Sequence, residues 1–168
     1  MEAKFLERLE RMEAVEEIRR LKALYAKYAD NGWPGGSKDG MALARLFTED
    51  GVWDGGHVCQ GHAAIAQWFR EVGWRAPNWD TGPVRKKMGI HMAINPHITV
   101  NGRHASGVWH GFITRVHPDR QQSIILAGKY FDDFEKTDVG WRIKKLSFVP
   151  AFNADRENSW TNSQRITI

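Results

Sequence analysis

The chain has 168 residues, with 24 lysine and arginine residues against 20 aspartate and glutamate residues, and a net charge of +4. This length suits one domain with a proper core, so we expect a single domain over residues 1–168. An apolar fraction of 42% is ordinary for a globular protein. No apolar run approaches the ~18 residues that a membrane-spanning helix needs, which excludes such a helix.

The positive charge does not indicate a nucleic-acid partner. The excess is small, and only the segment 84–89 clusters three basic residues. Neither a zinc-finger spacing nor the aromatic-glycine pattern of an RNA-binding sheet is present. The charged N-terminal segment lacks the apolar core of an export signal, and the single cysteine, Cys59, permits no internal disulfide. We therefore predict a cytoplasmic protein without nucleic-acid or membrane partners.

Residues 4–30 are predicted to form one long helix. Apolar residues recur at steps of three and four and give one stripe: Phe5, Leu9, Met12, Val15, Ile18, Leu21, Tyr25 and Tyr28. From Leu21 onward, Ala23, Ala26 and Asp30 form a second face of small residues. A helix that is apolar on more than one face is covered on more than one side. The last turns are therefore expected to lie inside the domain, where the Asp30 carboxylate needs a partner.

The next segment is predicted to contain two shorter helices around a brief strand. The first helix lies within 41–47 and is followed by a turn at 49–51, then by a strand around Val52 and Trp53. Residues 61–74 form the second amphipathic helix, with Ile65, Trp68 and Phe69 on its apolar side. The loop over 76–89 is long enough to act as a flap.

The second half is predicted to form four strands. Strands over 90–100 and 104–116 are joined by the tight pair Asn101-Gly102, and strands over 123–137 and 140–150 are joined around 138–140. Helices followed by a strand meander indicate an α+β domain, a curved and mostly antiparallel sheet with the N-terminal helices packed on its concave face. Pro96 and Gly107 are expected to mark bulges or bends that produce the curvature.

Two further features concern the interior and the end of the chain. Eight tryptophans favour an apolar, aromatic-lined cavity. The C-terminal tail, residues 150–168, is polar with scattered apolar residues, and we expect it to cover the pocket or a neighbouring subunit.

The order of these elements resembles the SnoaL-like branch of the nuclear-transport-factor-2-like superfamily. The matching segments are IRRLKALYAKYADNG, LFTEDGVWDGG, GHAAIAQWF, HMAINPHITVNGRHASGVWHGF and GKYFDDFEKTDVGWRI, which together span 18–146. The resemblance implies a cone-shaped α+β barrel with a deep apolar pocket, assembled as dimers or trimers. Within this group the sequence is most similar to the cofactor-free lyases of the bile-acid dehydratase, dehydrochlorinase and scytalone dehydratase type.

The resemblance also implies roles for individual residues. It gives His91 the role of general base and Asp30 that of the carboxylate that orients it, with Tyr25 as a third catalytic residue and His110 as a looser match to a second pocket histidine. For Tyr25, packing in the core is nearly as good an explanation. Dehydrochlorinases carry lysine at the position of Tyr25 and arginine at that of Leu146, which makes dehalogenation the less favoured chemistry.

Substrate contacts are expected from residues that share the inner side of the strands with His91. Asn95 lies four residues beyond His91 in the same predicted strand, so both side chains are expected on the same face of the sheet. Neighbouring residues of a strand face opposite sides, so only one of Trp109 and His110, and only one of Lys129 and Tyr130, can face the pocket. The expected substrate-binding set is His110, Asn95, Trp53, Trp109 and Tyr130. His57 and His62 lack the spacing of zinc-binding pairs on a helix and no carboxylate motif accompanies them, so we predict no metal site.

These observations predict a cofactor-independent lyase that eliminates water or another small group from an apolar cyclic or aromatic molecule. A neutral imidazole oriented by a carboxylate suits proton removal from carbon. The same pair would also serve an isomerase, a cyclase or a carbon–carbon lyase that releases formaldehyde. A non-catalytic alternative is a ligand-binding module or one like the small subunit of a ring-hydroxylating dioxygenase. We expect a hydrophobic small-molecule partner, no cofactor, and a homo-oligomer, either a trimer or a dimer.

Overall fold

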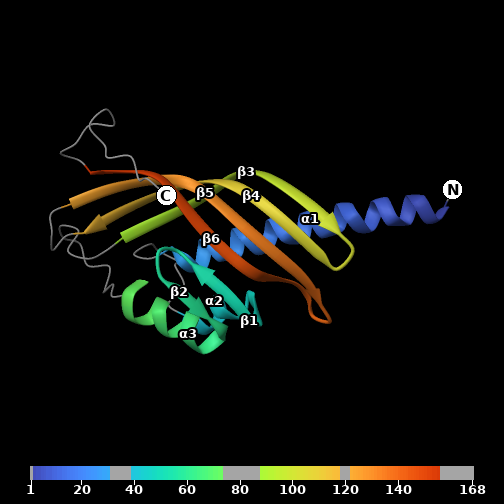
Figure 1. The fold of residues 1–168 in the computed structure, drawn as a ribbon, viewed down its shortest axis with the longest axis horizontal. Coiled ribbons are helices and arrows are strands. Elements are labelled where there is room, and N and C mark those ends of the chain that lie inside the picture. Colours follow the sequence, from blue (N-terminus) through green and yellow to red (C-terminus); the bar gives the residue numbers. More distant parts are fainter. Residues whose placement is uncertain (1, 31–38, 74–87, 118–121, 156–168) are drawn as a thin grey trace, which may run out of the picture.

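The computed structural model describes residues 2–30, 39–73, 88–117 and 122–155 of the chain. One long helix is followed by short helices and strands and then by four long strands (Figure 1). In chain order the elements are α1 (Glu2–Ala29), α2 (Gly40–Ala44), β1 (Phe47–Asp54), β2 (Val58–Gln60), α3 (Gly61–Trp68), the π-helical turn η1 (Phe69–Gly73), β3 (Met88–Asn101), β4 (His104–His117), β5 (Gln122–Thr137) and β6 (Gly140–Asp155).

The six strands form one curved sheet in the order β2-β1-β6-β5-β4-β3. All neighbouring strands are antiparallel except β1 and β6, which run parallel. The predicted α+β class and mostly antiparallel sheet are confirmed. Within the described residues the sheet stays open, with β2 and β3 at its edges, and does not close into a barrel. Helix α1 runs along one face of the sheet, beside β3 (Figure 1).

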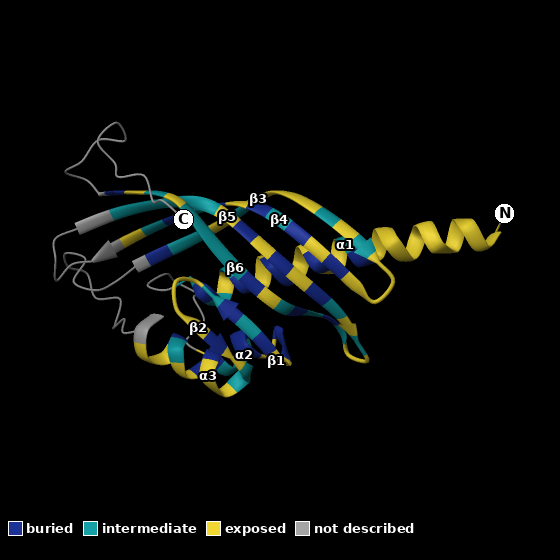
Figure 2. Ribbon diagram, in the orientation of Figure 1, coloured by how far each residue is buried: buried dark blue, intermediate teal, exposed yellow. Residues whose placement is uncertain are grey.

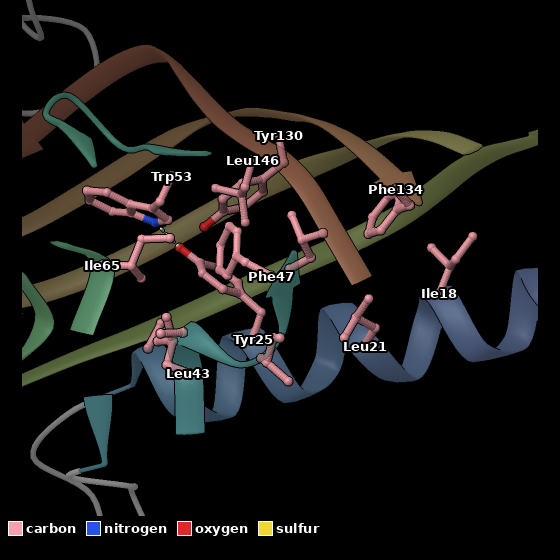
Figure 3. Packing of buried hydrophobic residues seen from close by; sticks show 14 of the residues in the cluster. Ile18, Leu21, Tyr25, Leu43, Phe47, Trp53, Ile65, Tyr130, Phe134 and Leu146 are labelled. Atoms are coloured by element: carbon pink, nitrogen blue, oxygen red, sulfur yellow. Dashed lines mark hydrogen bonds between the residues drawn. The ribbon is translucent and has the colours of Figure 1, made fainter. Parts of the chain in front are cut away.

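The hydrophobic core lies between α1 and the inner face of the sheet. Ile18, Leu21 and Tyr25 point from α1 toward the strands, where Phe134 and Leu146 face them (Figure 3). Full burial of one such side chain stabilises a fold by about 1.5–3 kcal/mol. This contact fixes the position of α1 on the sheet and therefore the position of Asp30 at its end.

Helix α1 has the predicted extent but not the predicted burial. Its N-terminal half extends beyond the sheet and is exposed (Figure 2). Phe5 and Met12 in this half are 65% and 68% exposed. The apolar stripe is covered only from Ala14 onward. Of the expected second face, Ala23 is exposed whereas Ala26 and Asp30 are half-buried, so this face is covered only toward the end of the helix.

Three local predictions had different outcomes. Pro96 lies at an irregularity of the β3–β4 register between Ile94 and His97, where Asn95 has a φ of 51°, so the bulge is confirmed. Gly107 pairs regularly; a Cβ there would lie 2.2 Å from the Trp109 ring, so this glycine makes room for an indole. The turn expected at 49–51 was wrong, since these residues continue β1, with an irregular register toward β6.

Strand β2 was not predicted, and the helix predicted over 61–74 is divided into α3 and the π-helical turn η1. Both hairpins form where expected, with Gly102 at a φ of 56° and Gly140 at a φ of 100°. Strand β6 continues to Asp155, so the first part of the predicted tail is strand. The rest of the tail and most of the predicted flap lie outside the described residues. No helix within the described ranges is long and apolar enough to cross a membrane.

Candidate active site

The end of α1 meets the edge strand β3 through Asp30 and His91. Asp30 follows the last helical residue, and its N–H still donates to the Ala26 carbonyl at 2.9 Å, so its backbone is held in place at the end of α1. His91 lies opposite Ile113 in the β3–β4 register, and Ile113 is buried on the inner face. Paired residues share a face of the sheet, so the His91 ring also lies on the inner face.

One carboxylate oxygen accepts two hydrogen bonds from His91. Asp30 Oδ1 lies 2.6 Å from the His91 backbone nitrogen and 3.0 Å from ring Nδ1. The first contact satisfies an N–H that an edge strand would otherwise leave unpaired. The second assigns the ring proton to Nδ1, because an ionised carboxylate only accepts. The lone pair therefore resides on Nε2, as a general base requires.

The surroundings of His91 favour its neutral form. Its side chain is 13% exposed and that of Asp30 is 23% exposed. Burial lowers the pKa of His91 below its ordinary value of 6.5, although the hydrogen bond and the charge of Asp30 oppose this shift. At neutral pH the ring is therefore uncharged and able to accept a proton.

A cluster of buried aromatic side chains, Tyr25, Trp53 and Tyr130, lies near this pair on the inner side of the sheet, and we call it the floor; the charge of Asp30 acts on both tyrosines. Trp53 Nε1 donates a hydrogen bond of 2.8 Å to the Tyr25 hydroxyl oxygen, and the Tyr130 hydroxyl points toward the same place (Figure 3). Burial raises the pKa of both tyrosines, so both phenols keep their protons. Because Tyr25 accepts from Trp53, its own proton is available for donation to another group.

Sequence reasoning missed a buried ion pair under this floor. Lys22 Nζ lies 2.6 Å from Asp132 Oδ2, and the two side chains are 2% and 0% exposed. The ammonium also lies 3.6 Å from the centre of the Tyr130 ring, a cation–π distance. Among the described residues, Asp132 Oδ1 is buried without a hydrogen-bond partner. The local sequence of α1 does not indicate that Lys22 is buried, because its partner Asp132 lies 110 positions away in the chain.

The structure divides the predicted substrate-binding residues into two groups. Trp53, Trp109 and Tyr130 are buried on the inner side of the sheet. Trp109 rather than His110, and Tyr130 rather than Lys129, therefore faces inward. His110 is exposed on the other face of β4, because it alternates with Trp109. Asn95 is exposed at the bulge, where the expected alternation no longer holds. We therefore correct the assignments of His110 and Asn95, which do not lie on the floor.

Across the described ranges, no group of three or more histidine, cysteine, aspartate or glutamate side chains could hold a metal ion. Cys59 is buried, and burial raises the pKa of its thiol, which disfavours the reactive thiolate. The contact between His91 and Asp30 offers acid–base chemistry at His91, and the Tyr25 hydroxyl group is a hydrogen-bond donor near it.

A long helix packed along the inner face of a curved, open, mostly antiparallel sheet defines an α+β protein of the nuclear-transport-factor-2-like type. The chain belongs to the SnoaL-like domain family, whose model matches residues 10–147. Among proteins of curated function, none matches this sequence.

Solved structures with the same fold include several named after enzymes. A type 2 hexachlorocyclohexane dehydrochlorinase, LinA, is 19% identical with a TM-score of 0.68, over 89% of this chain and 91% of that chain. A scytalone dehydratase-like protein from Novosphingobium aromaticivorans is 20% identical with a TM-score of 0.67, over 95% of both chains. An NTF2-like protein with a cystatin-like fold from the same organism is 25% identical with a TM-score of 0.60, over 95% of this chain and 93% of that chain. At such identities these likenesses establish the fold.

Proposed function

We propose that this protein is a lyase that removes a proton from carbon with His91 and expels water or another small group from an apolar cyclic or aromatic substrate. The carrying observation is the 3.0 Å contact between His91 Nδ1 and Asp30 Oδ1. It leaves Nε2 as the basic atom and provides a carboxylate to stabilise the imidazolium that forms. Dehydratase and dehydrochlorinase names among proteins of this fold support the same reaction class.

The hydroxyl groups of the floor complete the proposed step. As Nε2 takes the proton, the electron pair of the broken C–H bond moves toward the leaving group or into an adjacent carbonyl. A protonated phenol such as Tyr25 donates a hydrogen bond to the oxygen that gains charge. The raised pKa of Tyr25 keeps this donor protonated throughout the working range of a neutral imidazole. The protein's own side chains thus supply both the base and the donor.

Proton removal can be tested before the natural substrate is known. The protein is incubated in D₂O with a panel of cyclic ketones that carry a β-hydroxyl or β-halide group, and deuterium at the α-carbon is followed by mass spectrometry. We expect exchange above the buffer rate for some members, and a loss of about 10²–10⁴-fold in His91→Ala. His97→Ala is the matched control, since this exposed histidine of β3 lies beyond the bulge.

The products of the same incubations identify the reaction. Loss of water or halide supports the lyase, whereas a rearranged product without loss of a group would assign the protein to the isomerases. Exchange that is equal in His91→Ala and the parent protein would contradict the proposed base.

A further inference from the structure

Arg115, a positively charged residue of β4, lies on the same face of the sheet as His91, the proposed base. Along β4 the inner residues Trp109, Gly111 and Ile113 are buried, and they alternate with less buried neighbours. Arg115 is the next residue in this alternation and is exposed. Since side chains two residues apart in a strand share one face, Arg115 continues the inner face to a point where the core no longer covers it.

The strand register places Arg115 next to His91. His91 pairs with Ile113, and Gly89 pairs with Arg115. Arg115 is therefore the diagonal neighbour of His91 across the two strands, a relation that separates residues by about 7–8 Å and lies within reach of a long side chain. Gly89, directly opposite Arg115, has no side chain to occupy the space between the strands.

The guanidinium has no carboxylate partner among the described residues. Of the two carboxylates nearest the floor, Asp30 is engaged by His91 and Asp132 by Lys22. The charge nevertheless reaches the proposed site. The pKa of His91 is lowered mainly by burial, and the positive charge of Arg115 lowers it further. The same charge opposes the effect of burial on the pKa of Tyr25.

We infer that Arg115 binds a carboxylate of the substrate and holds its apolar ring over the floor with a C–H bond beside His91 Nε2. This inference rests on the proposed function and specifies its substrate class as cyclic or aromatic carboxylates. A planar guanidinium matches a carboxylate with two parallel hydrogen bonds, which fixes direction as well as position. The ring then lies on the inner face next to Arg115, where its apolar neighbours are Ile113 and the Tyr130 ring beside Gly111, so one end of the ligand is charged and the other apolar.

Binding of two probes of equal shape tests this site. The dissociation constants of 2-naphthoate and of the neutral 2-naphthamide are measured by calorimetry at low ionic strength. The parent protein should bind the carboxylate more tightly, and Arg115→Gln should lose about tenfold or more of the affinity for 2-naphthoate while binding 2-naphthamide unchanged. Arg103→Gln is the matched control, because Arg103 is exposed in the turn at the far end of the same hairpin.

The outcomes separate this inference from the proposed reaction. His91→Ala should keep the preference for the carboxylate, so the result does not depend on turnover. An equal loss in Arg103→Gln and Arg115→Gln would overturn the site in favour of a general charge effect. It would also be overturned if the parent protein showed no preference for the carboxylate, including the case in which neither probe binds.

Discussion

Replacement of Lys22 by methionine probes the most deeply buried charges of the fold. The variant leaves the Asp132 carboxylate inside the core without its 2.6 Å partner, and Oδ1 of that carboxylate already lacks a hydrogen bond to any described residue. Breaking a buried pair on one side costs about 3–5 kcal/mol, because an uncompensated charge remains. We expect Lys22→Met to lower the free energy of unfolding by this amount.

The double variant Lys22→Met/Asp132→Val removes both charges and is the matched control. Replacing a buried ion pair by apolar side chains of similar size is often neutral or stabilising. We therefore expect the double variant to lie within about 1–2 kcal/mol of the parent protein, well above the single variant. Equilibrium urea unfolding followed by tryptophan fluorescence measures all three proteins. A single variant as stable as the parent, or a double variant as unstable as the single one, would refute the reasoning.

The pH dependence of this difference follows from the pKa of Asp132. Burial raises that pKa from 3.8 to about 6, even though Lys22 acts against the shift. A carboxyl group with a raised folded-state pKa contributes stability that is fully present below pH 3.8 and is lost as the pH rises through 6. Removal of Lys22 raises the pKa further, so the unpaired carboxyl takes up a proton more readily. The defect of Lys22→Met should therefore be smaller at pH 5.5 than at pH 8.

Four further predictions concern the site and the surface. Because burial lowers the pKa of His91, we expect the exchange rate to stay level above pH 6.5 and to fall only below it; a midpoint above 6.5 would contradict a buried neutral base. Asp30→Asn should slow exchange by about a hundredfold or more, measured under the same conditions, because the amide no longer fixes the ring proton on Nδ1. Trp53→Phe removes the donor to Tyr25 and should cost about 1–3 kcal/mol in urea unfolding; an unchanged midpoint would show that this hydrogen bond carries no stability. The exposed apolar face of α1 predicts self-association of this helix, so Met12→Glu should reduce the mass measured by analytical ultracentrifugation, whereas an unchanged mass would place any interface elsewhere.

The order of elements could be predicted because each one has a local cause. The three- and four-residue steps of apolar residues specify α1, and Asn101-Gly102 specifies the β3–β4 turn. The prediction of a turn at 49–51 was wrong because turn-forming residues also fit a strand with an irregular register. Gly51 is accommodated there by close approach, since a Cβ would lie 2.8 Å from the Phe47 Cβ.

The site was predictable only in part, because its contacts join distant positions. The pair of Asp30 and His91 spans 61 positions and came from the family resemblance, not from the local pattern. The choice between Trp109 and His110 depends on which face of β4 meets α1, and strand alternation alone does not decide this. The exposure of the N-terminal half of α1 has a similar cause, since an amphipathic stripe indicates a partner without saying whether the same chain provides it.

Nuclear magnetic resonance of the histidine ring nitrogens tests the central claim most directly. With the His91 signal assigned by comparison with His91→Ala, long-range proton–nitrogen correlation at pH 7 reports which ring nitrogen carries the proton. The hydrogen bond to Asp30 predicts a neutral ring that is protonated on Nδ1 and bare on Nε2. A proton on Nε2, or a doubly protonated ring at this pH, would contradict the account of His91 as the general base.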